Sequence, residues 1–374
     1  MQSNRACLAL VAGLFIATPP AIAAEHKIIV LQAVTGVASF FGVPVTEGIK
    51  FGLDELNAKG FFGADKIVYE VVDTNSTRAQ AMAAVTRYAA DPSVLMIFGP
   101  STAVEGIPAS DVANNAKIPM KAMTVATGVL NAGPWSFISP QPPQVTMPQL
   151  ADYAIDVGKV KTCSTIRFVD NEAYVDMEKY FVEHAEKRGL RFVDRSGIKV
   201  ADSDFSAVST RIVAAKPECI ALFTLGPSAA NLIIQLKQAG LPVSTRIYGQ
   251  TGLASPQLVQ IGGTAVEGVI FNSDWTPGGN TAASKAFAEA FKVKTGKEPD
   301  SFAALGYSYA QVVGTALKAT LPDPTREKLR DALQKTKDVP VVVGNGKYSY
   351  VDRFPSYGSI FLQVKNGKFE LAPQ

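Results

Sequence analysis

The stretch "IFGPSTAVEGIPAS", residues 97–110, decides the fold. An apolar run over residues 94–98 stops at Gly99-Pro100, two hydroxyl residues follow, and a helical pattern then begins. A buried strand that leads straight into a helix is typical of the βαβ units of parallel sheets. Hydroxyls and backbone N–H groups at the start of such a helix suit an anion. We therefore expect ligand contacts in this loop.

The same alternation of strand and helix runs along most of the chain. Two such runs predict an α/β fold with two doubly wound parallel-sheet lobes. Residues 279–337 show three helical patterns without a strand, so we expect the chain to cross between the lobes more than once. The predicted strands are residues 27–33, 66–73, 94–98 and 118–123 and, after "SPQPP" (139–143), residues 163–169, 191–198, 219–224, 246–249 and 269–272.

Residues 1–24 have the features of a signal peptide. Arg5 precedes an apolar run over residues 7–17, and Pro19-Pro20 lead to Ala21-Ile22-Ala23, an A-x-A cleavage pattern. The apolar run is well short of the ~20 residues that span a bilayer. We therefore expect an exported protein that does not span the membrane after signal cleavage.

The composition is that of a globular chain of two domains. It has 374 residues, of which 47% are hydrophobic and 18% charged, and its net charge is +3. The basic residues are scattered singly, so we do not expect nucleic acid as a partner. Cys163 and Cys219 remain after removal of the leader. They form either one disulfide, which an oxidising compartment permits, or two buried thiols.

The sequence lacks the motifs that would make this chain an enzyme. It contains no G-x-x-x-x-G-K-[ST], no G-x-G-x-x-G and no G-x-S-x-G. Its two histidines are His26, at the expected mature terminus, and His184, which we interpret as a surface residue within a helix. Metal-ligand spacing is also absent. We expect no cofactor, no metal and no catalysis, and interpret the chain as a solute binder that closes on its ligand.

Five segments in the same order carry a resemblance to a known family. They are "LDELNAKG" (53–60), "FGPSTAVEGIPASDVANNAKIPM" (98–120), "NEAYVDMEKYF" (171–181), "DSDFSAVSTRI" (202–212) and "QLKQAGL" (235–241). Together they resemble the substrate-binding proteins of branched-chain amino-acid ABC transporters, which have the type I periplasmic binding fold.

The resemblance implies two lobes joined by a three-crossover hinge. Lobe 1 would comprise residues 25–141 and 273–349, and lobe 2 residues 142–272 and 350–374. It also implies a periplasmic monomer that captures a small carboxylate ligand and delivers it to the membrane permease of an ABC transporter. An exported sensor module with the same fold is the alternative function.

In that family, hydroxyls and backbone N–H groups of the first lobe hold the ligand carboxylate. The family's loop serine corresponds to Ala103, and Ser101 and Thr102 lie beside it. For Thr102, a helix cap is the alternative role. The second hydroxyl falls in "TVATG", where the candidates are Thr124, Ala126 and Thr127.

The resemblance assigns the rest of the ligand to residues of both lobes. Tyr174 matches a second-lobe tyrosine that covers the ligand. Phe41 takes the place of an aromatic residue against the ligand and Leu225 replaces another, with plain packing as the alternative role of both.

Gln250-Thr251 stand where the family has an acid for the ligand's ammonium group. An unpaired buried ammonium is costly. We therefore expect an aromatic or branched organic acid without a free amino group. An amino acid held through water is the alternative.

Overall fold

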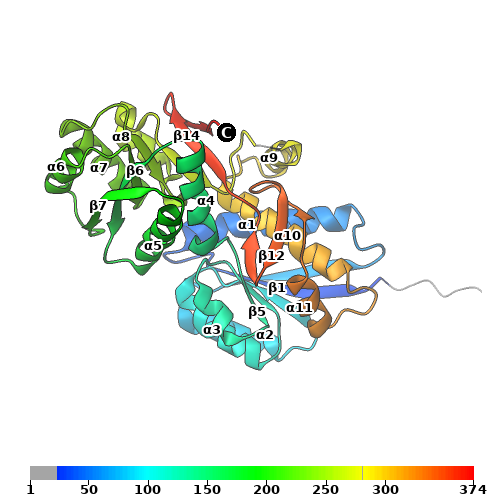
Figure 1. The fold of residues 1–374 in the computed structure, drawn as a ribbon. Coiled ribbons are helices and arrows are strands. Elements are labelled where there is room, and N and C mark those ends of the chain that lie inside the picture. The colour runs from blue at the N-terminus through cyan, green and yellow to red at the C-terminus, as the bar shows by residue number, and fades with distance from the viewer. Residues whose placement is uncertain (1–22, 280) are drawn as a thin grey trace, which may run out of the picture.

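The computed structural model describes residues 23–279 and 281–374. The predicted signal peptide therefore lies outside the described residues, apart from residues 23 and 24. The described chain forms two α/β lobes, one coloured mainly blue, cyan and orange and the other mainly green (Figure 1). This arrangement confirms the predicted fold class. No helix among the described residues is long and apolar enough to cross a membrane.

Lobe 1 is built on a five-stranded parallel sheet with the order β2-β1-β3-β4-β5. Side chains on both faces of the sheet are buried, as the continuous apolar runs predict, except along the edge strand β2, which is largely exposed or half-buried. The strands are β1 (Glu25–Gln32), β2 (Lys66–Asp73), β3 (Val94–Phe98), β4 (Met120–Ala122) and β5 (Ser136–Ile138). One face is covered by α1 (Ser39–Ala58), α9 (Ala282–Thr295), α10 (Ser301–Lys318) and α11 (Arg326–Gln334), and the other by α2 (Arg78–Ala89) and α3 (Ala103–Asn115).

Lobe 2 has a seven-stranded sheet with the order β15-β14-β10-β9-β8-β6-β7. β14 and β15 are antiparallel to their neighbours and meet at a turn of Asn366 and Gly367. The strands are β6 (Thr162–Phe168), β7 (Arg191–Ile198), β8 (Cys219–Phe223), β9 (Arg246–Gly249), β10 (Ile270–Ser273), β14 (Ile360–Lys365) and β15 (Lys368–Leu371). One face carries α4 (Pro143–Asp156) and α5 (Glu172–Lys187), and the other α6 (Ser206–Ala214), α7 (Gly226–Gln238) and α8 (Pro256–Gly262).

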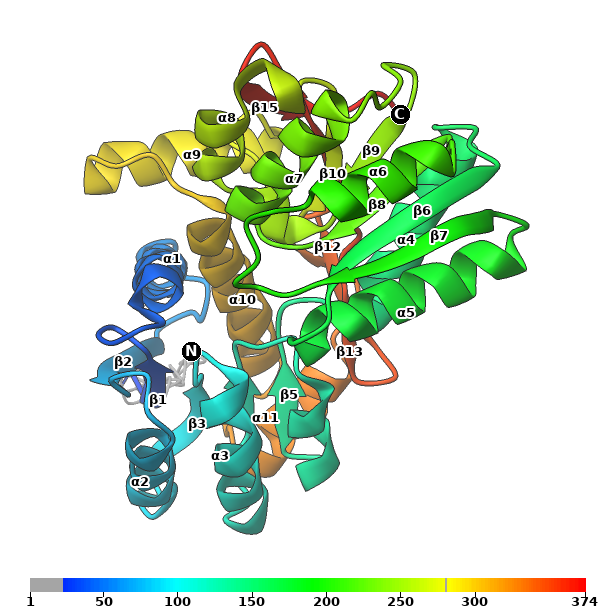
Figure 2. The same ribbon diagram turned by 90° about the vertical axis from the view of Figure 1, so that its left-hand side faces the viewer.

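The chain passes between the two sheets three times. The first passage lies between β5 and α4, the second between β10 and α9, and the third between β13 (Phe354–Ser356) and β14. β11 (Val339–Pro340), β12 (Lys347–Val351) and β13 form a separate antiparallel sheet. The pairing of β13 with β12 keeps residues 350–356, which the sequence analysis assigned to lobe 2, beside lobe 1. Figure 2 shows lobe 2 above lobe 1, with α10 at their junction.

Two expected helix starts differ from the structure. Thr46 precedes Ile49, Leu53 and Leu56 at helical spacing, so the sequence predicts it as the N-cap of the first helix, but α1 begins at Ser39. The Thr46 hydroxyl instead donates to the carbonyl of Gly42 within the helix, 2.7 Å away. The earlier start places Phe41 in the first turn of α1. For α2 the sequence offers Asn75 or Ser76 as the cap, but Thr77 caps the helix, two residues after Asn75 and one after Ser76.

Lys121 is buried between lobe 1 and the β11–β13 sheet. Its side-chain nitrogen donates to the hydroxyls of Tyr348 (3.0 Å) and Tyr350 (2.6 Å) and contacts the Ser139 hydroxyl. Burial holds the pKa of Lys121 well below its usual range. Through Lys121, these contacts connect β12 to Ser139, the first residue after β5 and the start of the first passage.

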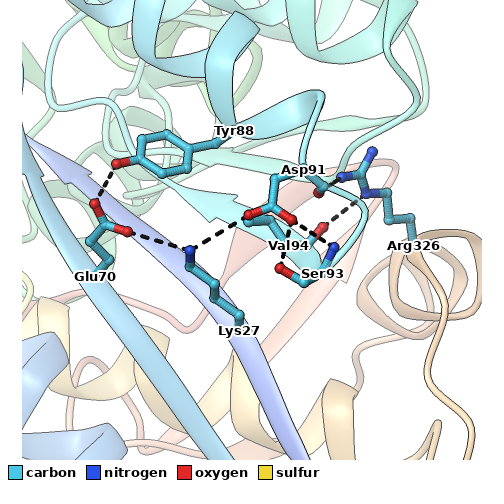
Figure 3. Close-up of polar contacts among 7 residues, drawn as sticks. All are labelled: Lys27, Glu70, Tyr88, Asp91, Ser93, Val94 and Arg326. Atoms are coloured by element: carbon cyan, nitrogen blue, oxygen red, sulfur yellow. Dashed lines mark hydrogen bonds and ion pairs between the residues drawn. The ribbon is translucent and has the colours of Figure 1, made fainter.

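Arg326 anchors the returning helical segment to lobe 1 (Figure 3). Its guanidinium donates to the carbonyls of Ala89 (3.0 Å), Asp91 (2.7 Å) and Val94 (2.9 Å). Nearby, Lys27 lies 3.5 Å from a Glu70 carboxylate oxygen and 3.6 Å from one of Asp91 (Figure 3). Helix α11 is thereby held against the start of β3.

Cys163 and Cys219 form a disulfide in this structure. They lie opposite each other in the parallel strands β6 and β8, with 4.5 Å between their Cα atoms. Both are fully buried. Of the two alternatives that the sequence left open, the structure shows the disulfide.

Candidate functional site

A cavity of about 130 Å³ lies where the two lobes and the interlobe passages meet. An engineered protein cavity of ~150 Å³ holds benzene, so this space admits a small ligand. Its position fits the rule that open α/β sheets bind ligands beyond the carboxyl ends of their strands. The lining residues are Phe41, Val125, Pro140, Gln141, Pro143, Thr146, Met147, Met177, Gln250, Thr251, Asp274, Phe302 and Leu305.

Three of the residues singled out in the sequence line this cavity: Phe41, Gln250 and Thr251. The ring of Phe41 packs edge-on against Phe302 of α10, with 5.0 Å between the ring centres. The two rings form the apolar wall on the lobe 1 side. Thr251, half-buried, begins the 3-10 helix η2 (Thr251–Leu253) on the lobe 2 side.

The Gln250 amide is used within its own loop. Its nitrogen donates to the carbonyl of Thr224 (2.7 Å), and its oxygen accepts from the backbone N–H of Gly252 (2.6 Å). The side chain is buried. Gln250 therefore shapes the wall and joins the ends of β8 and β9.

Asp274 brings a carboxyl group into the cavity that the sequence analysis missed. It follows β10 directly, and only 8% of the residue is exposed. Its Oδ1 accepts a hydrogen bond from the Tyr357 hydroxyl, 3.0 Å away. Burial raises the pKa of Asp274 to about 6, and the bond from Tyr357 opposes part of that rise. Among the lining residues it is the one ionisable side chain.

The hydroxyl groups of the loop at residues 99–103 form hydrogen bonds within lobe 1. The Ser101 hydroxyl donates to the side-chain oxygen of Gln32 (2.7 Å) and accepts from the backbone N–H of Ala33 (2.8 Å). Thr102 caps α3 in a capping box with Glu105, so it has the alternative role that the sequence left open. Ala103 is the first residue of α3, and none of these three residues lines the cavity.

Glu105 already supplies a negative charge at the start of α3. The side chain is fully buried, and its Oε2 accepts from both the backbone N–H (3.0 Å) and the hydroxyl (2.7 Å) of Thr102. A helix N-terminus favours one nearby anion. A ligand carboxylate in the same place would meet repulsion from Glu105.

The segment after β4 lies closer to the cavity. Val125 lines the cavity, and the neighbouring Thr124 hydroxyl accepts from the backbone N–H of Ala126 (3.2 Å). Thr127 is half-buried at the start of the 3-10 helix η1 (Thr127–Ala132). No residue that the structure describes forms a hydrogen bond with its hydroxyl. Thr124, Ala126 and Thr127 do not line the cavity themselves.

Tyr174 and Leu225 stay outside the cavity as it stands in this structure. Tyr174 packs edge-on against Phe168, with 5.3 Å between the ring centres, and burial raises its pKa to about 12. It lies one turn before Met177, which does line the cavity. Leu225 precedes α7 and is 43% exposed.

The sequence contained a signal that identifies Asp274. The stretch "NSDWTP" follows a predicted strand and lies at an expected interlobe passage, where strand-end side chains meet a ligand. Gln141 lies at the expected passage after residues 136–138 in the same way, whereas for Thr146 and Met177 no comparable signal exists. Their place in the cavity depends on how α4 and α5 pack beside the first passage.

Two α/β lobes, three connecting passages and a cavity between them define a class of protein that captures a small solute. A family model described as "Periplasmic binding protein" matches residues 25–368. The chain belongs to this family.

Named relatives and solved structures agree with the family assignment. The Leu/Ile/Val-binding protein BraC3 of Rhizobium johnstonii is 26% identical over 366 residues, which cover 96% of each chain. A putative branched-chain amino acid ABC transporter structure from Rhodospirillum rubrum superposes with a TM-score of 0.86 at 24% identity, covering 93% of this chain and 100% of that one. LivJ of Streptococcus pneumoniae, solved with isoleucine, gives a TM-score of 0.75 at 23% identity over 92% of this chain and 98% of that one.

Proposed function

We propose that this protein is the extracytoplasmic substrate-binding component of an ABC transporter for amino acids or related small carboxylates. It captures its ligand between the lobes, does not transform it, and delivers it to a membrane permease. The observation that carries the proposal is the cavity, because both lobes and the passages between them supply its walls. The names of relatives that bind leucine, isoleucine and valine support the ligand class.

We further propose where the ligand's carboxylate lies. The candidate is the segment of residues 124–127, because Val125 lines the cavity and the Thr127 hydroxyl has no hydrogen-bond partner among residues 23–279 and 281–374. The loop of residues 101–103 is a weaker candidate, since Glu105 fills the start of α3.

We take lobe 1 as residues 25–141 with 273–356 and lobe 2 as residues 142–272 with 357–374.

A thermal-shift panel of the twenty L-amino acids, small carboxylic acids and sugars tests the ligand class. A ligand at a hundred times its Kd stabilises the folded protein by ~2.7 kcal/mol, so a true ligand raises Tm clearly. We expect the amino acids or acids to do so and the sugars to have no effect. A panel in which no amino acid or acid raises Tm contradicts the proposal.

A variant pair tests the carboxylate position. Thr127→Val removes the hydroxyl at nearly constant shape, and we expect it to weaken binding of the ligand found in the panel by about 10-fold. Thr86→Val is the matched control, because among the residues that the structure describes the Thr86 hydroxyl bonds to the Met82 carbonyl alone, within α2. Equal affinities of the two variants would place the carboxylate elsewhere.

A further inference from the structure

One residue from each interlobe passage meets at a single hydrogen-bonded cluster. The Gln141 side-chain oxygen accepts from the backbone N–H groups of Tyr357 (3.0 Å) and Gly358 (3.2 Å). The Gln141 backbone N–H donates to the Tyr357 hydroxyl (3.3 Å), which in turn donates to Asp274. Gln141, Asp274 and Tyr357 belong to the first, second and third passages in that order. The hinge is therefore tied together at the wall of the cavity.

The carboxylate of Asp274 is only partly satisfied by this cluster. Tyr357 bonds to Oδ1, and no residue that the structure describes bonds to Oδ2. None of the lining residues is Lys or Arg. A buried carboxylate without a cationic partner is unfavourable. A positively charged group on the ligand would remove that penalty.

We propose that Asp274 selects ligands that carry a cationic nitrogen, such as the ammonium group of a zwitterionic amino acid, by pairing with that group through Oδ2. This deepens the proposed function and depends on it. It also replaces our expectation of a ligand without an amino group, which rested on Gln250-Thr251 alone.

The position of Asp274 gives the pairing a second consequence. Because Asp274 is bonded to Tyr357 and Tyr357 to Gln141, the ligand's charge contacts the point that fastens all three passages. The acid that pairs with the ligand's cationic nitrogen is thus part of the hinge. Gln250 cannot take this role, since both ends of its neutral amide are bonded within the loop.

Calorimetry with matched ligand pairs tests the proposal. Each pair joins an amino acid to the acid of the same skeleton without the amino group: alanine and propanoate, valine and 3-methylbutanoate, leucine and 4-methylpentanoate, phenylalanine and 3-phenylpropanoate. The proteins are the wild type, Asp274→Asn, and Asp204→Asn as control. Asp204 is an exposed acid of lobe 2 that bonds to the backbone of Ser206 and does not line the cavity.

We expect the wild type and Asp204→Asn to prefer the amino acid of the bound pair. Asp274→Asn should weaken its binding by about 10- to 100-fold and abolish the preference. Binding of the acids with equal or higher affinity, unchanged in Asp274→Asn, would overturn the proposal and leave the proposed function standing. Binding of neither series would overturn the proposed function and this proposal with it.

A second measurement on the wild type does not depend on the folding of a variant. The affinity for the amino acid should fall as the pH drops below about 6, where Asp274 takes up a proton. The affinity for the matched acid should not fall in that range. A pH-independent affinity for the amino acid between pH 5 and 8, in buffers of equal ionic strength, would also overturn the proposal.

Discussion

Tyr357 holds the Asp274 carboxyl in place, and its hydroxyl influences the pH at which the cavity loses its negative charge. The hydrogen bond from Tyr357 lowers the pKa of Asp274, which burial raises to about 6. A further ionisable group, Tyr309 on α10, lies 3.4 Å from Tyr357, hydroxyl to hydroxyl. Burial raises the pKa of both tyrosines well above the usual value, so neither ionises in this range.

Tyr357→Phe should therefore raise the pKa of Asp274 further. We expect the midpoint of the affinity–pH curve for an amino acid to move to higher pH in this variant, with little change of affinity at pH 8. Titration calorimetry between pH 5 and 8 measures the shift. A purely structural role for Tyr357 would lower stability and leave the midpoint where it is in the wild type.

Two variants of Tyr174 distinguish a role of this residue in covering the ligand from a role in packing. Tyr174→Ala should weaken ligand binding by roughly 2 kcal/mol if the ring covers the ligand when the lobes close. Tyr174→Phe, which keeps the ring against Phe168, should retain most of the affinity. Calorimetry on both variants gives the answer. A Tyr174→Ala affinity within threefold of the wild type, with a lowered Tm, would show that the residue is structural.

The individual site residues were predictable only in part. Phe41, Gln250 and Thr251 line the cavity, because each follows or faces a strand end where the fold gathers its ligand contacts. Ser101 and Thr102 do not line it, because their hydroxyls bond to Gln32 and Glu105. Glu105 is three residues from Thr102, so sequence spacing can reveal that bond. Gln32 is 69 residues from Ser101, so sequence spacing cannot reveal the other. Asp274 was not predicted, although it directly follows a predicted strand at an expected interlobe passage.

At the scale of elements, Arg326 ties α11 to the end of α2 and the start of β3, beside the buried Leu329 and Leu333 of the same helix. We expect Arg326→Met to lower the free energy of unfolding by ~2–3 kcal/mol, since three backbone carbonyls lose a charged donor. Lys328→Met, on the same helix, is the control. The Lys328 ammonium group bonds to the exposed Asp323, so its loss should change stability by less than ~0.5 kcal/mol. Urea unfolding of both variants measures the difference. Equal stabilities would contradict the anchoring role.

The disulfide fastens two central strands of lobe 2. It closes a loop with a sequence separation of 56 residues, and loops of this length correspond to a stabilisation of ~2–4 kcal/mol. We expect the double variant Cys163→Ala/Cys219→Ala to melt at a lower temperature than the wild type. A reductant present during unfolding should lower the Tm of the wild type alone. A wild type whose Tm is insensitive to the reductant, with the double variant equally stable, would contradict the disulfide.

The regular elements were well predicted because their signals are local. The expected strands at 66–73, 191–198 and 246–249 have the bounds of β2, β7 and β9, since each is a compact apolar or alternating run between turn residues. The start of α1 was not predicted correctly, and the sequence carries no signal for the pairing of β13. Both depend on packing: α1 lies against α10, and β13 pairs with β12 rather than joining the lobe 2 sheet.

At the scale of the molecule, apolar side chains stand exposed beyond strand ends of both lobes. Phe40, in the first turn of α1, is 73% exposed, Val104 of α3 is 69% exposed, and Leu225 before α7 is 43% exposed. Burying such groups is favourable by ~25 cal/mol per Å². We expect lobe closure to cover them and to bring Leu225 toward the cavity.

Small-angle X-ray scattering tests the central claim, capture of a ligand between two closing lobes, most directly. The sample is the wild type, alone and saturated with the amino acid that gives the largest thermal shift, with a non-binding sugar as control. We predict a smaller radius of gyration and maximum dimension with the amino acid only, because hinge closure at the three passages draws the lobes together. Identical scattering of the free and saturated protein would contradict the account.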